Sequence, residues 1–131
     1  MTSDGAAFVA AWDAAFNAAP EAAAELFAED ARYEDHRPLG WEPLHGRTAI
    51  REWFRTLSTG GATIRARSRV LEETPARIAI AQVFQIVAGE ADGGGDGEVT
   101  VWVVLRLAGG LIAELRIFGD QEAALAAFRA A

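Results

Sequence analysis

The sequence contains no cysteine and no lysine, and it has only one tyrosine and two histidines among 131 residues. Without cysteine the chain cannot form a disulfide, a thiolate metal site or a thiolate nucleophile. Without lysine it cannot form a side-chain Schiff base. The 19 acidic residues outnumber the 12 basic ones, all of them arginine, and the net charge is −7. This negative charge disfavours nucleic acid and anionic membranes as partners.

Several kinds of segment and site are also missing. No apolar run approaches the length of a membrane span. The N-terminus MTSDGAAFVAAW has an early acid and no basic stretch, which is unlike a signal peptide, so we expect a cytoplasmic protein. The two histidines, His36 and His45, are separated by a loop containing proline and glycine and lack the spacing of a metal motif. We therefore expect neither a metal nor a cofactor.

The chain is long enough for one domain, residues 1–131, with a single core because 51% of its residues are hydrophobic. Apolar side chains recur at helical spacing in its first half, as in Ile50, Trp53, Phe54 and Leu57. Asp120 is a candidate N-cap for a closing helix. The predicted helices run from Asp4 to about Ala18, from Pro20 through Phe27, from Gly46 to Leu57, and from Asp120 onward.

Alternating apolar residues predict the strands. The two glycines Gly109 and Gly110 favour a tight hairpin between the last two strands. The predicted strands are 31–35, 62–73, 76–89, 98–107 and 111–118, with a loop at 36–45 and antiparallel pairing. Together the elements predict an α+β domain with helices on one face of a curved antiparallel sheet.

Several short motifs carry a resemblance to a known family. They are Glu29-Asp30-Ala31, Tyr33-Glu34-Asp35, His45-Gly46-Arg47 and Ala49-Ile50 followed by Trp53-Phe54. With the order of elements, they resemble the NTF2-like superfamily, and within it the SnoaL-like polyketide cyclases and the ketosteroid isomerases. The resemblance implies a cone in which helices close a strongly bent sheet around an apolar pocket. It also implies a homodimer through the outer sheet face.

The resemblance implies a catalytic role for Asp35, because the ketosteroid isomerases have their general base at this position. Strand alternation places Tyr33 on the same face as Asp35 and Glu34 on the other. An apolar surrounding would raise the pKa of Asp35 and suit it to base catalysis near neutral pH. Tyr33 would donate a hydrogen bond to a developing oxyanion. Asp35 has a structural alternative, in which its carboxylate at the strand end accepts hydrogen bonds from the loop backbone. The structural alternative for Tyr33 is an aromatic side chain that fills the core.

Two further residues are candidates for acid–base chemistry. Histidine side chains can exchange a proton near neutral pH, so His36 would act as an acid beside Asp35, or it would be a loop histidine paired with Glu34 or Glu42. Asp120 ends the last strand, where several cyclase and epoxide-hydrolase relatives place a catalytic aspartate. Asp120 would then be an orienting group or a second acid–base group. Its structural alternative is helix capping.

The predicted pocket is apolar and suits a small hydrophobic ligand; a filled core is the alternative. Gln82 alternates inward with Ile80 and needs a polar partner, either ligand, water or Tyr33. The residues expected to line the pocket are Trp12, Phe16, Trp53, Phe54, Ile80, Gln82, Phe84, Val101, Val103, Leu115 and Ile117.

The opposite sheet face is expected to carry an exposed apolar patch of Trp102, Val104 and Phe118, which a homodimer would cover. The predicted dimer interface consists of Thr100, Trp102, Val104, Arg106, Arg116 and Phe118.

Two functions are compatible with this sequence. The first is a cofactor-independent acid–base enzyme of isomerase, cyclase, dehydratase or epoxide-hydrolase type, acting on a small hydrophobic molecule with Asp35 as the base. The second is a non-catalytic ligand-binding or dimerisation module. It is motivated by Ala11 and Val103, which stand where ketosteroid isomerases have their two oxyanion donors.

Overall fold

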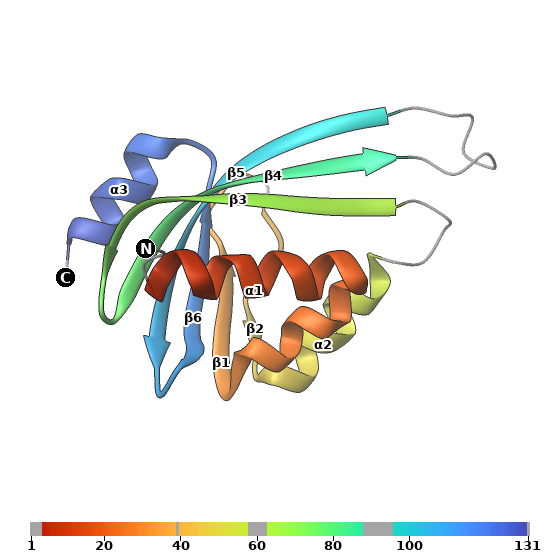
Figure 1. Cartoon of the computed structure of the whole chain (residues 1–131), viewed down its shortest axis with the longest axis horizontal. Coiled ribbons are helices and arrows are strands. Elements are labelled where there is room, and N and C mark those ends of the chain that lie inside the picture. The colour runs from red at the N-terminus through yellow and green to blue at the C-terminus, as the bar shows by residue number, and fades with distance from the viewer. Residues whose placement is uncertain (1–3, 39, 58–62, 88–95, 131) are drawn as a thin grey trace.

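The computed structural model describes residues 4–38, 40–57, 63–87 and 96–130. Figure 1 shows a long curved sheet flanked by helices. In chain order the elements are α1 (Asp4–Ala18), the 3₁₀ helix η1 (Pro20–Leu26), β1 (Phe27–Asp35), β2 (Leu44–His45), α2 (Arg47–Thr56), β3 (Thr63–Thr74), β4 (Arg77–Val87), β5 (Asp96–Ala108), β6 (Leu111–Phe118) and α3 (Gln121–Arg129).

The strands form one mixed sheet with the order β2-β1-β6-β5-β4-β3. The four long strands β3 to β6 are antiparallel, as predicted. By contrast, β1 runs parallel to β6, so the expectation of an entirely antiparallel sheet is wrong at this pair. The two strands are distant in sequence, and no hairpin forces them to run in opposite directions.

Three helices cover the inner face of the sheet. Phe16 of α1, Ile50 and Phe54 of α2 and Phe27 of β1 are almost completely buried in the main core. The prediction of helices on one face is correct for α1, η1 and α2. The closing helix α3 instead packs on the outer face.

The outer position of α3 follows from its own apolar side chains. Phe128 and Ala124 form a second, smaller cluster with Ala79 and Val104. Asp120 caps this helix, because its side chain accepts a hydrogen bond from the backbone N–H of Ala123 at 2.7 Å.

Side chains of α1 bond to the backbone of β3, the strand at one edge of the sheet. Asn17 accepts from the N–H of Ala66 at 2.6 Å and donates to its carbonyl at 2.9 Å. One turn earlier, Asp13 accepts from the N–H of Ser68 at 2.8 Å. The spacing of four on the helix matches the spacing of two on the strand. These bonds hold α1 against the rim of the sheet.

Some predicted boundaries differ from the structure. Phe27 begins β1 and does not belong to the second helix. The predicted loop at 36–45 ends in the short strand β2, which pairs with Arg32 and Tyr33 of β1. The predicted strand ends at positions 62 and 89 lie outside the described residues. None of the described helices is long and apolar enough to cross a membrane.

Candidate active site

A cavity of about 300 Å³ lies between the inner face of the sheet and the helices α1 and α2. Its described lining is mostly apolar, and seven of the residues are aromatic. The lining residues are Trp12, Phe16, Tyr33, Arg37, Trp41, Trp53, Phe54, Leu57, Ile64, Gln82, Phe84, Ile86, Val99, Val101, Leu115 and Ile117.

The aromatic side chains make one connected cluster. Trp12 stacks on Phe16 with ring centroids 4.9 Å apart. Phe54 meets Phe16 edge to face at 6.0 Å and Tyr33 at 5.7 Å. Phe84 closes the other side, 5.5 Å from Phe16. Such interlocked rings fix one another, so the cavity has a firm wall beneath α1 and α2.

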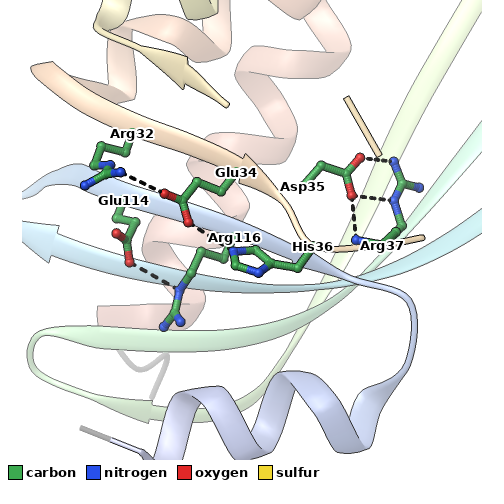
Figure 2. Close-up of polar contacts among 7 residues, drawn as sticks. All are labelled: Arg32, Glu34, Asp35, His36, Arg37, Glu114 and Arg116. Atoms are coloured by element: carbon green, nitrogen blue, oxygen red, sulfur yellow. Dashed lines mark hydrogen bonds and ion pairs between the residues drawn. The ribbon is translucent and has the colours of Figure 1, made fainter. Parts of the chain in front are cut away.

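Asp35 ends β1 beside this cavity, but it is not among the described residues that line it. Its carboxylate accepts three hydrogen bonds from Arg37: from the backbone N–H at 3.0 Å, from Nε at 2.9 Å and from Nη2 at 2.7 Å. The Asp35 side chain has no exposed surface. Figure 2 shows this forked pair at the end of the strand. Arg37 therefore lies between the carboxylate and the cavity.

This pairing determines the charge state of Asp35. Burial alone would raise the pKa of Asp35, but the hydrogen bonds and positive charge of Arg37 outweigh burial and hold the pKa below its usual value. The expectation of a raised pKa is therefore wrong. An apolar surrounding alone would raise this pKa, but Arg37, two residues later in the chain, reverses the direction.

Arg37 and Trp41 form the rim of the cavity. The Arg37 guanidinium lies over the Trp41 ring at 5.0 Å, and Trp41 contacts Trp53 with ring centroids 4.8 Å apart. Gly40 supports the arrangement from behind, because a Cβ at this position would lie 2.7 Å from the Asp35 carboxyl carbon. The segment after β1 thus folds back as a compact layer.

Tyr33 lies inside the cavity, as alternation on the strand predicts. It is 7% exposed, and its ring meets Phe54 edge to face. Burial, with the nearby charge of Asp35, raises the pKa of Tyr33 above its usual value. The phenol therefore stays protonated at neutral pH and can donate a hydrogen bond to a ligand.

Gln82 is the polar residue on the opposite wall. Its Nε2 donates to the Ser68 hydroxyl at 3.1 Å, and this hydroxyl donates to Asp13 at 2.7 Å. Gln82 thus has a polar partner, as its inward position predicts, but the partner is Ser68 and not Tyr33.

The other proposed catalytic residues are not part of the cavity lining. His36 is exposed; its Nε2 lies 3.0 Å from Glu34, and its ring stacks on Phe118 at 5.1 Å. Glu34 and Asp35 point to opposite sides of the strand (Figure 2). Asp120 is exposed and caps α3. For both His36 and Asp120, the structure has the alternative arrangement named from the sequence.

Most of the residues predicted to line the pocket lie at the cavity. Val103 and Ile80 are the exceptions, because both are buried in the core and do not reach the cavity. The predicted lining residues that the cavity does contact are Trp12, Phe16, Trp53, Phe54, Gln82, Phe84, Val101, Leu115 and Ile117.

The outer sheet face carries the residues of the expected dimer interface. Trp102 pairs with Phe118 and Val104 with Arg116 in adjacent strands. Thr100 and Arg106 are exposed, and Trp102, Arg116 and Phe118 are partly buried. The expectation of an exposed Val104 is wrong, because this residue is only 1% exposed and packs with α3. A dimer through the remaining surface stays a prediction.

Sequence reasoning missed two residues of the cavity rim, Arg37 and Trp41. The pattern Asp35-x-Arg37 at the end of a strand, followed by a tryptophan in a loop with proline and glycine, is the only feature that pointed to them. The remaining lining residues outside the predicted set are Leu57, Ile64, Ile86 and Val99.

Comparisons with known proteins agree with this geometry. A family model described as a SnoaL-like domain matches residues 6–115. No curated protein sequence matches the chain. A protein of ketosteroid isomerase-like fold from Catenulispora acidiphila, solved with trimethylamine, has 23% identity and a TM-score of 0.72 over 96% of this chain and 92% of that one.

Two further solved structures have the same fold. A proposed polyketide cyclase of Pseudomonas putida has 18% identity and a TM-score of 0.71, covering 93% of this chain and 94% of that one. An LEH-like epoxide hydrolase of M. tuberculosis has 16% identity and a TM-score of 0.69, covering 95% of this chain and 84% of that one. At these identities the likeness establishes the fold.

Proposed function

The chain belongs to the SnoaL-like domain family, and from this premise we propose that its cavity binds a small hydrophobic organic molecule. The observation that carries the proposal is the cavity of about 300 Å³ with its aromatic lining. A concave apolar site with few polar groups is typical of small-molecule binding. The polar groups here are the phenol of Tyr33, the guanidinium of Arg37 and the amide of Gln82.

Substitution of Val101 by phenylalanine tests the binding proposal. Val101 lines the cavity and is 3% exposed, so a larger side chain takes up ligand space. We expect the dissociation constant of 2-naphthol to rise about tenfold or more, equal to about 1.4 kcal/mol. The measurement is quenching of tryptophan fluorescence, to which Trp12, Trp41 and Trp53 contribute from the cavity wall.

Val83→Phe is the matched control for Val101→Phe. Val83 lies on the neighbouring strand β4, partly buried and away from the cavity, on the opposite face of the sheet. It should leave 2-naphthol binding unchanged. An equal loss of 2-naphthol affinity in both variants, or no loss of affinity in Val101→Phe, would contradict binding in this cavity.

A second candidate function is a cofactor-independent acid–base enzyme of isomerase, cyclase, dehydratase or epoxide-hydrolase type. The ion pair of Asp35 with Arg37, which lines the cavity, favours it. Arg37 and Tyr33 would donate hydrogen bonds to an oxygen on which negative charge develops. Asp35 would accept a proton after the Arg37 side chain turns from it toward the ligand. His36 and Asp120 take no part in this scheme.

The acid–base proposal can be tested with 5-nitrobenzisoxazole, whose ring opens when a base removes its carbon-bound proton. Asp35→Asn is expected to lower the protein-dependent rate about a hundredfold, near the lower end for a general base. A larger decrease in the rate is not expected, because the Asp35 carboxylate is paired with Arg37. The rate is followed by the absorbance of the phenolate product.

Glu34→Gln provides the control for Asp35→Asn, since it removes the neighbouring carboxylate on the other side of the same strand. Its rate should equal that of the unmodified protein. If both variants retain the full rate, Asp35 is not a base, and ligand binding without catalysis is the remaining function.

A further inference from the structure

Gln82 differs from the rest of the cavity wall. It carries a polar amide, although the residue is only 4% exposed. It lies on β4 directly opposite Ser68 of β3, with both residues on the inner face. A buried amide needs hydrogen-bond partners for its carbonyl as well as for its N–H groups.

The bonds of Ser68 fix the orientation of this amide. Asp13 accepts from both the backbone N–H and the hydroxyl of Ser68, at 2.8 and 2.7 Å. A carboxylate has no proton to give, so the single proton of the Ser68 hydroxyl is directed at Asp13. The hydroxyl oxygen can then only accept from Gln82. The NH₂ group of Gln82 must therefore face Ser68, and its carbonyl oxygen must face away.

The carbonyl oxygen of Gln82 is unpaired within the described part of the chain. It accepts no hydrogen bond from any described residue, and it is not sealed from solvent by protein atoms. Since Gln82 lines the cavity, this oxygen faces the space that a ligand would fill. A ligand without a donor would cover the oxygen and leave it unpaired, which is unfavourable in an apolar surrounding.

We propose that the Gln82 carbonyl, oriented by Ser68 and Asp13, selects hydrophobic ligands that carry a hydroxyl or N–H donor. This inference rests on the proposed function and adds the chemical class of the ligand. The apolar walls bind the body of the molecule, and the fixed carbonyl oxygen of Gln82 accepts a hydrogen bond from one donor on it. An ether or hydrocarbon of the same shape binds more weakly, because it leaves the acceptor unpaired.

The test compares two probes, 2-naphthol and 2-methoxynaphthalene, which share the ring system and the oxygen but differ in the donor. Unmodified protein is expected to bind 2-naphthol about tenfold more tightly, as one hydrogen bond in a buried site provides. In Gln82→Leu the two dissociation constants should become about equal. Binding of 2-methoxynaphthalene should be unchanged or tighter, since no polar group is left uncovered.

Two more variants separate selectivity from folding. Gln85→Leu is the matched control, because Gln85 is an exposed glutamine of the same strand on the other face. It should keep the tenfold preference. Ser68→Ala retains Gln82 but frees its amide to turn, so the preference should fall between those of the unmodified protein and Gln82→Leu. The preference is a ratio within one variant and does not depend on how much of the protein is folded.

The outcomes distinguish this inference from the proposed function. If neither probe binds, the cavity is not a binding site, and both proposals fail. If both probes bind equally to the unmodified protein, the binding function stands and the role of Gln82 is overturned. A preference for 2-naphthol that persists in Gln82→Leu also overturns it, because the donor is then received elsewhere. Should Gln82→Leu not fold, Gln82→Met serves the same comparison.

Discussion

Replacing Arg37 by methionine is expected to lower the free energy of unfolding by about 3 kcal/mol at pH 7. The Asp35 side chain has no exposed surface and receives two hydrogen bonds from the Arg37 side chain. Without the guanidinium, a negative charge stays buried with only the backbone N–H as a partner. The value lies toward the lower end for broken buried pairs because the Arg37 side chain is 26% exposed.

The loss in Arg37→Met should depend on pH in a defined direction. In the unmodified protein the pKa of Asp35 is lower folded than unfolded. The pair therefore stabilises the fold above the unfolded pKa, about 4, and this stability is lost as pH falls through the folded pKa. In the variant, burial is left to raise the pKa of Asp35, so protonation relieves the unpaired charge. The difference between the two proteins should shrink from pH 7 toward pH 4.

Urea unfolding at several pH values measures this difference. Adding Asp35→Asn to Arg37→Met should restore much of the lost stability at pH 7, because no charge then remains to be buried. Arg55→Met, which breaks an exposed pair with Glu52, should cost about 0.5 kcal/mol or less. A difference that is the same at every pH would show that Arg37 acts through packing on Trp41 and not through charge.

Replacing Phe54 by alanine is expected to lower the free energy of unfolding by about 4 kcal/mol. The side chain is 2% exposed and lies at the centre of the aromatic cluster. Its ring centroid is 6.5 Å from Trp12, 6.0 Å from Phe16 and from Phe27, and 5.7 Å from Tyr33. The neighbouring rings hold one another and cannot close the space, so the new void joins the existing cavity.

Phe118→Ala is the comparison for Phe54→Ala. Phe118 is a partly buried ring on the outer face, where it stacks on His36. Removal of the Phe118 ring should lower the free energy of unfolding by less than half as much as Phe54→Ala, because little of its surface faces a packed interior. Urea unfolding of both variants gives the two values. Similar losses would mean that the aromatic cluster is not the main core.

Residue periodicity predicts the elements of this fold, because burial of one face places apolar residues at regular intervals in the sequence. The period of two on β4 places Gln82 and Phe84 on the inner wall, and the same rule places Tyr33 there. The helical spacing of Trp53 and Phe54 places them beside the cavity. These assignments depend only on which face of an element is buried.

Other features depend on contacts between distant segments, which periodicity does not contain. The outer position of α3 decides that Val104 is covered. The parallel pairing of β1 with β6 depends on the path of the whole chain. The fork between Arg37 and Asp35 requires the chain to turn back immediately after β1. Arg37 lies in a loop and belongs to no repeating pattern of residues, so its position in the sequence does not indicate such a turn.

The bonds between α1 and β3 also affect how copies of this protein can meet. An open strand edge invites another strand to add to it, and such edge-to-edge growth leads to aggregation. On β3 the backbone groups of Ala66 and the N–H of Ser68 are already taken by Asn17 and Asp13. The opposite edge is the two-residue strand β2, Leu44–His45, which is too short a template for a second chain. At these positions both rims of the sheet are poor sites for strand addition.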